Sequence, residues 1–463
     1  MMKRIISALT VMLTILIFTL SANVSAIIFT PSFEIRSESV YLYNTDTKSV
    51  IYEKEADKEQ YPGSLVQIMT AIIVLENCQD IENETITANS SLYKKFDDYE
   101  YQDDLRYADI YDGDKLSVKD YLHAMLLTSS CEAAVILADY FGNGDISLFV
   151  DKMNVKADDI GCTDTVFTNP EGLYDKKQVT TAKDMALITE YALSVPGFED
   201  IACAEEYQLT PLNPDNSHEG EWMINHSNSI ASPASDFYLY GVKGIKTANL
   251  DMGGRSLVTM GSSNGIKYIL VTLNAPMLNS DGDTIYYHMM DGYNIMDWAF
   301  NKFSYQVLLS KGEEQGEIKV DDSKDSGYVL IKPDKDITRL WYNEVDTTSI
   351  QRRITRAEDV TAPVKKGQKL GEIELWLGSE LIDKADLVAE SDVDRSFLEF
   401  NLSVAKNFFK SKWFKIAMVV SAVFTLIYFL ICLYAKKQYR SRAKGSFSNK
   451  KIVKKLYGNN RRR

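Results

Sequence analysis

Alternating and helical patterns of apolar residues divide most of the chain into helices and strands. Apolar residues at 40–43 and 50–52 flank the polar stretch 44–47, which predicts two strands joined by a turn. Four longer segments carry apolar residues at helical spacing, and three later segments have the composition of strands. The helices are predicted at about 64–75, 118–140, 182–193 and 286–303, and the strands at 238–247, 255–260 and 268–273. This mixture of helices and antiparallel strands predicts an α+β fold.

The pattern changes after about residue 307. Short apolar segments then recur between turn residues, which predicts a small all-β domain over 307–394. A helical pattern at 395–415 follows and predicts an amphipathic juxtamembrane helix. Residues 416–435 carry no charge, and twenty such residues are enough for one bilayer crossing. A buried helix of a soluble domain is the alternative, but the basic residues that follow favour a transmembrane helix.

The N-terminus has the pattern of a secretory signal peptide. Lys3 and Arg4 precede an apolar run that ends near Leu20, and small residues close the segment 1–26. An uncleaved N-terminal anchor is the alternative. Because positive residues stay on the cytoplasmic side, we expect a single-pass protein of the cell membrane with its body outside the cytoplasm and its tail, 436–463, inside.

Charge is distributed very unevenly along the chain. The net charge is −14, yet the tail holds twelve Lys or Arg and no acid, and segment 1–26 holds two, so the remainder carries −28. Such an acidic body argues against nucleic-acid binding, which needs clustered cations. The tail is suited to anionic lipid, or it serves only as a topology signal.

Cysteine usage does not indicate a metal or redox motif. Four cysteines precede the predicted span, and they form either two disulfides or, as we expect for so large a domain, none. The five cysteines are Cys78, Cys131, Cys162, Cys203 and Cys432.

Five short segments, in this order, resemble landmarks of one enzyme family. They are 61–71 with Ser64, 126–134 with Ser129, 169–173, 181–186 and 244–248 with Lys246. The family is that of the low-molecular-mass penicillin-binding proteins, the serine D-alanyl-D-alanine carboxypeptidases. The resemblance covers about 33–395. It implies a β-lactamase/transpeptidase-like domain at 33–306, with an antiparallel sheet and a helical subdomain, followed by the family's C-terminal β domain.

The resemblance assigns roles to four retained residues. Ser64 would be the nucleophile, placed where a helix N-terminus favours negative charge; a simple N-cap is its alternative role. Ser129 would relay a proton to the leaving group. Lys246 and Thr247 would bind the substrate, with Lys246 facing its carboxylate.

Three other family positions are altered. The lysine base that follows the nucleophile by three residues is here Gln67, whose amide cannot accept and return a proton near neutral pH. The asparagine of the second motif is Cys131, either a reactive thiol or, as we favour, a small buried filler. The glycine of the third motif is Ala248, whose methyl group is expected to crowd an acyl chain.

These residues are compatible with several functions. We favour a catalytically impaired homologue that binds peptidoglycan stem peptide, a β-lactam or a cell-wall partner. An active carboxypeptidase with a rearranged base is the first alternative, with Lys246 the best candidate base and His123 a weaker one. A non-enzymatic localisation or signalling ectodomain is the second. No motif indicates a metal or another cofactor.

Overall fold

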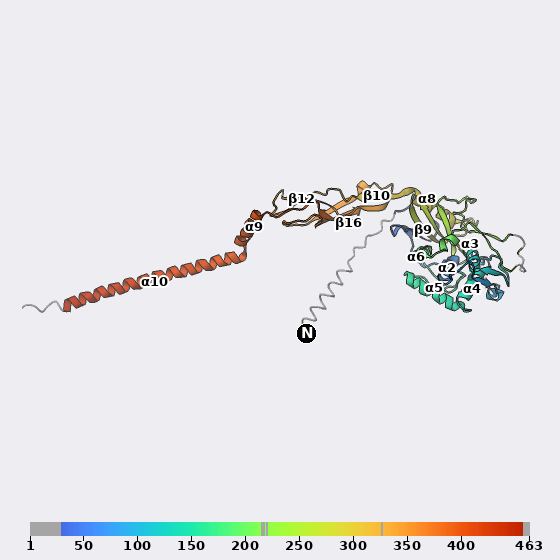
Figure 1. Cartoon of the computed structure of the whole chain (residues 1–463), viewed down its shortest axis with the longest axis horizontal. Coiled ribbons are helices and arrows are strands. Elements are labelled where there is room, and N and C mark those ends of the chain that lie inside the picture. The colour runs from blue at the N-terminus through green and yellow to red at the C-terminus, as the bar shows by residue number, and fades with distance from the viewer. Residues whose placement is uncertain (1–28, 214–217, 219–220, 326, 457–463) are drawn as a thin grey trace, which may run out of the picture. The chain divides into compact units, whose positions relative to one another are not determined.

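The computed structural model describes residues 29–213, 218, 221–325 and 327–456 (Figure 1). The expected signal peptide, 1–26, lies outside these residues. The described chain divides into two compact units. One holds the residues up to Leu308 with Ile337–Arg352 and Glu374–Lys384, and the other holds Leu309–Asp336, Arg353–Ile373 and the residues from Ala385 onward.

The first unit is built on a five-stranded antiparallel sheet in the order β2-β1-β9-β8-β7. Its strands are β1 (Ser39–Asn44), β2 (Ser49–Lys54), β7 (Val242–Leu250), β8 (Gly254–Ser263) and β9 (Ile266–Ala275). Their positions confirm the two N-terminal strands and the three later ones. The predicted strand at 238–247 begins only at Val242, because Gly241 takes a left-handed conformation (φ 90°) that ends the preceding turn.

Side-chain alternation in the sheet creates two cores. In β1, Tyr41 and Tyr43 join a core on one face, while Val40 and Leu42 join the core on the other. The first face is covered by helices that precede β7, including α2 and α6, and the second by α8, which Figure 1 shows on the opposite side of β9 from α6. The helices are α2 (Gln67–Asn77), α3 (Val118–Thr128), α4 (Cys131–Phe141), α5 (Ile146–Ile160), α6 (Ala182–Ser194), α7 (Phe198–Ala202) and α8 (Tyr287–Lys302).

The helix predicted over 118–140 is two helices, α3 and α4. Ser129 ends α3 in a left-handed conformation (φ 66°), and Ser130 begins α4 as its N-cap by accepting a hydrogen bond from the Ala133 amide. Local side-chain bonds to the backbone compete with helix continuation at such serines. The break therefore places Ser129 in a turn between two helices rather than inside one.

The landmark at 181–186 is a helix start. The Thr181 side chain accepts a hydrogen bond from the Asp184 amide at the N-terminus of α6, and the Asp184 carboxylate accepts from Thr165 Oγ1 at 2.7 Å. The motif therefore fixes α6 against the preceding loop. Two short antiparallel pairs complete this part: β3 (Thr85–Thr87) with β4 (Lys115–Ser117), and β5 (Glu206–Gln208) with β6 (Met223–Asn225).

The chain from Phe303 to Ala389 consists mainly of strands, as the sequence predicts for an all-β segment. A five-stranded sheet has the order β11-β12-β16-β15-β14, and β10 pairs with β13. The bounds are β10 (Phe303–Leu309), β11 (Glu317–Lys319), β12 (Tyr328–Pro333), β13 (Ile337–Tyr342), β14 (Gln351–Arg356), β15 (Lys369–Leu377) and β16 (Glu380–Ala389).

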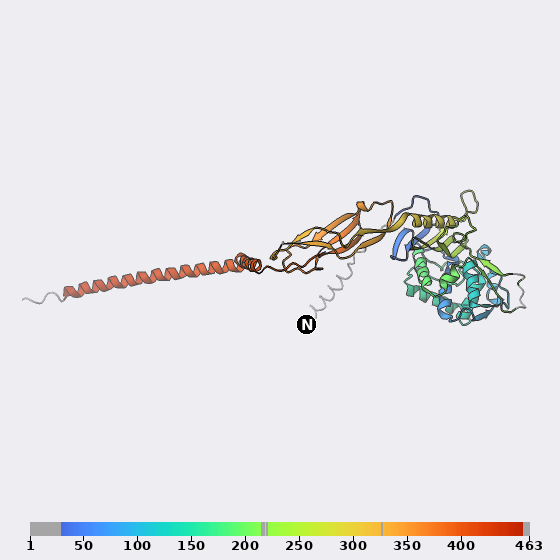
Figure 2. The ribbon, with the colours of Figure 1, turned by 45° about the horizontal axis from the view of Figure 1, so that its top comes forward.

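Two helices close the described chain. The amphipathic pattern forms α9 (Phe397–Lys410), and the apolar segment lies inside α10 (Lys412–Leu456), visible as one uninterrupted helix in Figure 2. Within the described residues, Lys412–Arg440 is the single helix long and apolar enough to cross a membrane, with a mean hydropathy of 2.7 over its most apolar window.

Candidate active site

Ser64 lies in a tight turn that precedes α2. It belongs to the 3-10 helix η1 (Gly63–Val66), and its hydroxyl donates to the Thr247 carbonyl at 3.0 Å. The alternative role of Ser64, a simple N-cap, is not seen, because neither η1 nor α2 has a side-chain cap and the Ser64 hydroxyl points to β7 instead. Gly172 packs closely against this turn: a Cβ added to Gly172 would lie 2.2 Å from the Gly63 carbonyl oxygen. The landmark at 169–173 thus places glycine where the Ser64 turn leaves no room for a side chain.

Gln67 is fully buried one helical turn after Ser64. Its amide nitrogen donates to the Ser129 carbonyl at 3.2 Å and to the Glu171 carbonyl at 3.1 Å. Its Oε1 has no hydrogen-bond partner among the described residues. Gln67 therefore ties together the α3–α4 break and the 169–173 loop, and it supplies no group that can take a proton.

Lys246 and Ser129 form a hydrogen-bonded pair in the site. Lys246 lies on β7 with no exposed surface, and its amine donates to Ser129 Oγ and to the Thr247 carbonyl, the latter at 3.1 Å. Burial, assisted by the nearby Arg106 charge, lowers the pKa of Lys246 to about 7. Ser64 and Lys246 thus share the Thr247 carbonyl as acceptor, and a carbonyl cannot serve as a base.

Cys131 is buried at the start of α4. Its thiol is 3.9 Å from the Ser129 carbonyl, and its neighbours are Phe96, Leu105 and Val135. Burial raises the pKa of Cys131 to about 12, so the reactive thiolate is not formed near neutral pH. All five cysteines are free thiols.

Thr247 and Ala248 complete the third motif. Thr247 Oγ1 is 2.6 Å from Ser227 Oγ, a contact from the segment after β6. The Ala248 methyl carbon lies 3.0 Å from the position that a Cβ on Gly63 would take. The methyl group therefore faces the turn that carries Ser64, close to the place where an acyl group would sit.

Four of the seven sequence-predicted residues line one cleft of about 290 Å³. They are Ser64, Ser129, Thr247 and Ala248, whereas Gln67, Cys131 and Lys246 lie buried behind its wall. His123 does not line this cleft: its ring stacks on Tyr207 at 3.6 Å, and burial lowers its pKa to about 4.

Sequence reasoning missed further polar residues of the cleft, because no motif spacing marks them. Arg106 comes from the loop before α3 and Arg255 from β8, and both line the cleft. Arg255 donates to Asn249 Oδ1 at 3.1 Å and lies 4.5 Å from the Tyr286 ring centre. The two guanidinium groups make this cleft suitable for an anionic group such as a carboxylate.

Glu132, next to Cys131, is a buried carboxyl group. Its Oε1 accepts from the Ala108 amide at 2.6 Å and the Ile110 amide at 3.5 Å, while Oε2 has no partner among the described residues. Burial raises its pKa to about 7. Glu132 therefore anchors the loop that carries Arg106. Among the described residues, no group of three or more His, Cys, Asp or Glu is arranged to hold a metal ion.

Two family models match the chain. One, described as D-alanyl-D-alanine carboxypeptidase, matches residues 25–277, and the other, described as penicillin-binding protein 5, C-terminal domain, matches residues 303–395. Among curated proteins, D-alanyl-D-alanine carboxypeptidase DacF of Bacillus subtilis is 24% identical over 403 residues, which cover 86% of this chain and 97% of the relative. The D-alanyl-D-alanine carboxypeptidase of Streptomyces sp. strain K15 is 27% identical over 253 residues, 53% of this chain and 84% of the relative.

Solved structures show the same fold. Penicillin binding protein 5 from Haemophilus influenzae is 23% identical and has a TM-score of 0.54, covering 79% of this chain and all of its own. The D-alanyl-D-alanine carboxypeptidase DacD from Francisella tularensis is 21% identical with a TM-score of 0.59, covering 80% of this chain and 97% of its own. These similarities confirm the expected fold class.

Proposed function

Because the chain belongs to the D-alanyl-D-alanine carboxypeptidase family, we propose that it binds the stem peptide of peptidoglycan in this cleft but turns it over poorly or not at all. The observation that carries this proposal is the environment of Gln67. Both donors of its amide are used on backbone carbonyls, and the Ser64 hydroxyl donates to the Thr247 carbonyl. Among the described residues, no group that could act as a base is hydrogen-bonded to the Ser64 hydroxyl.

A serine hydroxyl becomes a nucleophile when a base takes its proton. In a mechanism that needs this base, its loss lowers turnover by about 10⁴–10⁶-fold. Binding does not depend on the base. Thr247 and Ser129 hydroxyls, with Arg106 and Arg255, still offer hydrogen bonds and positive charge to a peptide carboxylate.

A second candidate function, an active carboxypeptidase with a rearranged base, is favoured by Lys246. Burial lowers its pKa to about 7, so the neutral amine that a base requires is accessible near neutral pH. Its contact with Ser129 Oγ would let the pair accept a proton from Ser64 if the Ser64 hydroxyl turned away from the Thr247 carbonyl. The third candidate, a non-enzymatic localisation or signalling ectodomain, shares the fold and needs no ligand in the cleft.

We place the body outside the cytoplasm, with α10 crossing the membrane and the tail inside. The support is the apolar helix Lys412–Arg440 and the basic residues 436–463. Protease added to intact, wall-stripped cells should remove the body and leave a short basic fragment. A protected body would contradict this topology.

Binding and turnover are separated by one experiment on the full-length chain in neutral detergent. Nα,Nε-diacetyl-lysyl-D-alanyl-D-alanine is titrated while released D-alanine is measured, with Ser64→Ala as the blank. We expect saturable binding with D-alanine release at the blank level. Release well above the blank would support the rearranged base, and absence of binding would favour the non-enzymatic ectodomain.

A further inference from the structure

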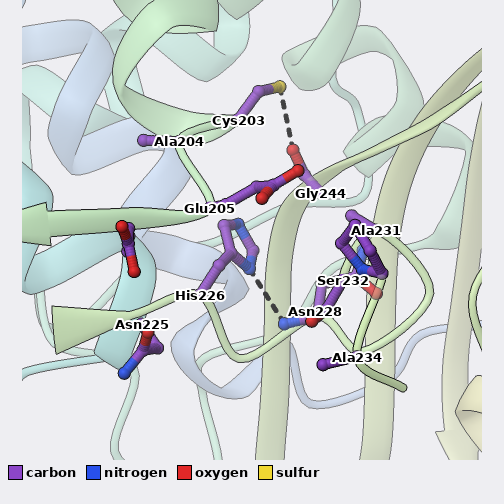
Figure 3. Close-up of a pocket in the computed structure, with 12 residues that line it drawn as sticks. Cys203, Ala204, Glu205, Asn225, His226, Asn228, Ala231, Ser232, Ala234 and Gly244 are labelled. Atoms are coloured by element: carbon purple, nitrogen blue, oxygen red, sulfur yellow. Dashed lines mark hydrogen bonds between the residues drawn. The ribbon is translucent and has the colours of Figure 1, made fainter.

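A second cavity, of about 330 Å³, is bordered by the same chain segment as the cleft. Figure 3 shows the residues that line it. Side chains of the segment after β6 alternate between the two spaces. His226 and Asn228 line the second cavity, whereas Ser227 and Ser229 line the cleft. The two spaces therefore share one wall.

His226 lines this cavity, and both of its ring nitrogens have hydrogen-bond partners within the protein. His226 Nε2 donates to the Ala202 carbonyl at 2.9 Å, and its Nδ1 accepts from the Asn228 amide at 2.8 Å. The ring also lies against β7, because a Cβ on Gly244 would be 2.7 Å from its Cε1. Burial, followed by the Lys246 charge, lowers the pKa of His226 to about 4. The histidine therefore brings no positive charge to the cavity at neutral pH.

The walls combine negative charge with small apolar surface. Glu205 and Glu206 are exposed at the cavity, and neither Lys nor Arg is among its twelve lining residues. The Glu205 carboxylate makes no ion pair or side-chain hydrogen bond within the described chain, and Figure 3 shows its side chain pointing toward Gly244. Cys203 donates its thiol to the Gly244 carbonyl at 2.9 Å. The apolar wall is made by Ala204, Ala231, Pro233 and Ala234.

We propose that this cavity binds a primary ammonium group carried on a short aliphatic stem. The stem fits the alanine and proline wall, and the ammonium faces carboxylates that lack a cation among the lining residues. The volume lies in the range of small-ligand pockets. Two sources carry this chemistry: the side chain of a lysine-like residue in a peptide, and a free aliphatic diamine. The site is separate from the cleft and does not depend on its chemistry.

Ligand binding is measured on the full-length chain in neutral detergent by saturation-transfer NMR with titration. The probes are Nα-acetyl-lysine methylamide for the peptide source and 1,5-diaminopentane for the free diamine; Nα,Nε-diacetyl-lysine methylamide is the uncharged match. We expect at least one amine to bind about tenfold more tightly than the uncharged match, and to weaken as salt is raised. The tighter of the two amines identifies the source. Equal binding of charged and uncharged probes would overturn the proposal.

Variants then locate the site. The double change Glu205→Gln with Glu206→Gln should weaken the amine about tenfold, and Ala234→Trp should block the cavity from its exposed rim. Glu59→Gln, a change at an exposed glutamate outside the cavity, is the matched control and should bind as the unchanged protein does. Each variant is checked by its thermal unfolding curve. Undiminished binding in the folded double variant or in the folded Ala234→Trp variant would refute this location.

Discussion

Replacing Gln67 with lysine should return acylation to a scaffold that lacks its base. Gln67 follows Ser64 by one turn and is fully buried, and its Nε2 already points at the Ser129 and Glu171 carbonyls. A lysine amine at this place can keep donating to those carbonyls while its neutral form accepts the Ser64 proton. A positioned general base contributes about 10²–10⁴-fold, so Gln67→Lys should raise the rate of β-lactam acylation by about that factor.

The structure also gives the cost of the change. Burial lowers the pKa of neighbouring Lys246 to about 7. A lysine at position 67 with a similar shift would lose about 4–5 kcal/mol of folding stability at pH 7. Removal of the unpartnered Gln67 Oε1 returns about 1–3 kcal/mol of that loss. We therefore expect a less stable but folded protein in which a substantial part of the new amine is neutral at pH 7–8, which is the form that acts as a base.

The assay is the rate of covalent labelling by a fluorescent β-lactam, measured on the full-length chain in detergent. Gln67→Met is the matched control, because it removes the amide without supplying an amine, and Ser64→Ala is the blank. The triple change Gln67→Lys, Cys131→Asn, Ala248→Gly should label faster than the single change, since misplacement by about 1 Å costs roughly a hundredfold. If the unchanged protein labels as fast as the triple variant, a rearranged base exists and the reasoning about Gln67 is wrong.

Further predictions test the buried carboxyl, the glycine contact and the tail. Burial raises the folded pKa of Glu132 to about 7 from 4.5, so its contribution to stability is fully present below pH 4.5 and is lost as the pH rises through 7. Thermal unfolding between pH 4.5 and 8 should show a loss of about 3 kcal/mol in the free energy of unfolding. This pH dependence should be much smaller in Glu132→Gln and unchanged in Glu59→Gln. The same pH dependence in both variants would contradict the assignment to Glu132. Gly172→Ala should destabilise by about 1–3 kcal/mol more than Gly144→Ala, because both glycines have positive φ but only Gly172 is crowded; equal losses of denaturation midpoint would refute the close contact. A peptide of residues 436–463 should bind anionic vesicles and be released by salt, at about 1 kcal/mol per cation near the surface; equal binding to neutral vesicles would exclude an electrostatic role.

The positions of the strands and of helices such as α6 and α8 could be predicted from the sequence, but the break between α3 and α4 could not. Alternation in β1 and the apolar runs of β8 and β9 identify buried strands directly, since short apolar runs bounded by turn residues are typical of strands. The break between α3 and α4 depends on Ser129 adopting a left-handed conformation, which periodicity does not register. For the same reason the apolar pattern at 238–241 predicts strand, although β7 begins only after the turn at Gly241.

The spacing of the motifs predicted the serine and threonine residues of the cleft but not the two arginines that line it. Ser64, Ser129 and Thr247 reach one cleft because the family landmarks place them on η1, the α3–α4 break and β7. Arg106 and Arg255 arrive from a loop and a neighbouring strand far apart in the sequence, so only the tertiary fold brings them together. The two carbonyl partners of Gln67 likewise could not be predicted, because they are backbone atoms of distant loops.

The central claim is that Ser64 lacks a working base. Its most direct test is the intact mass of the full-length protein after long incubation with a β-lactam at pH 7–8, followed by peptide mapping of residue 64. We expect no adduct at Ser64 above the Ser64→Ala blank, together with a clear adduct in Gln67→Lys. Stoichiometric acylation of Ser64 in the unchanged protein would contradict it.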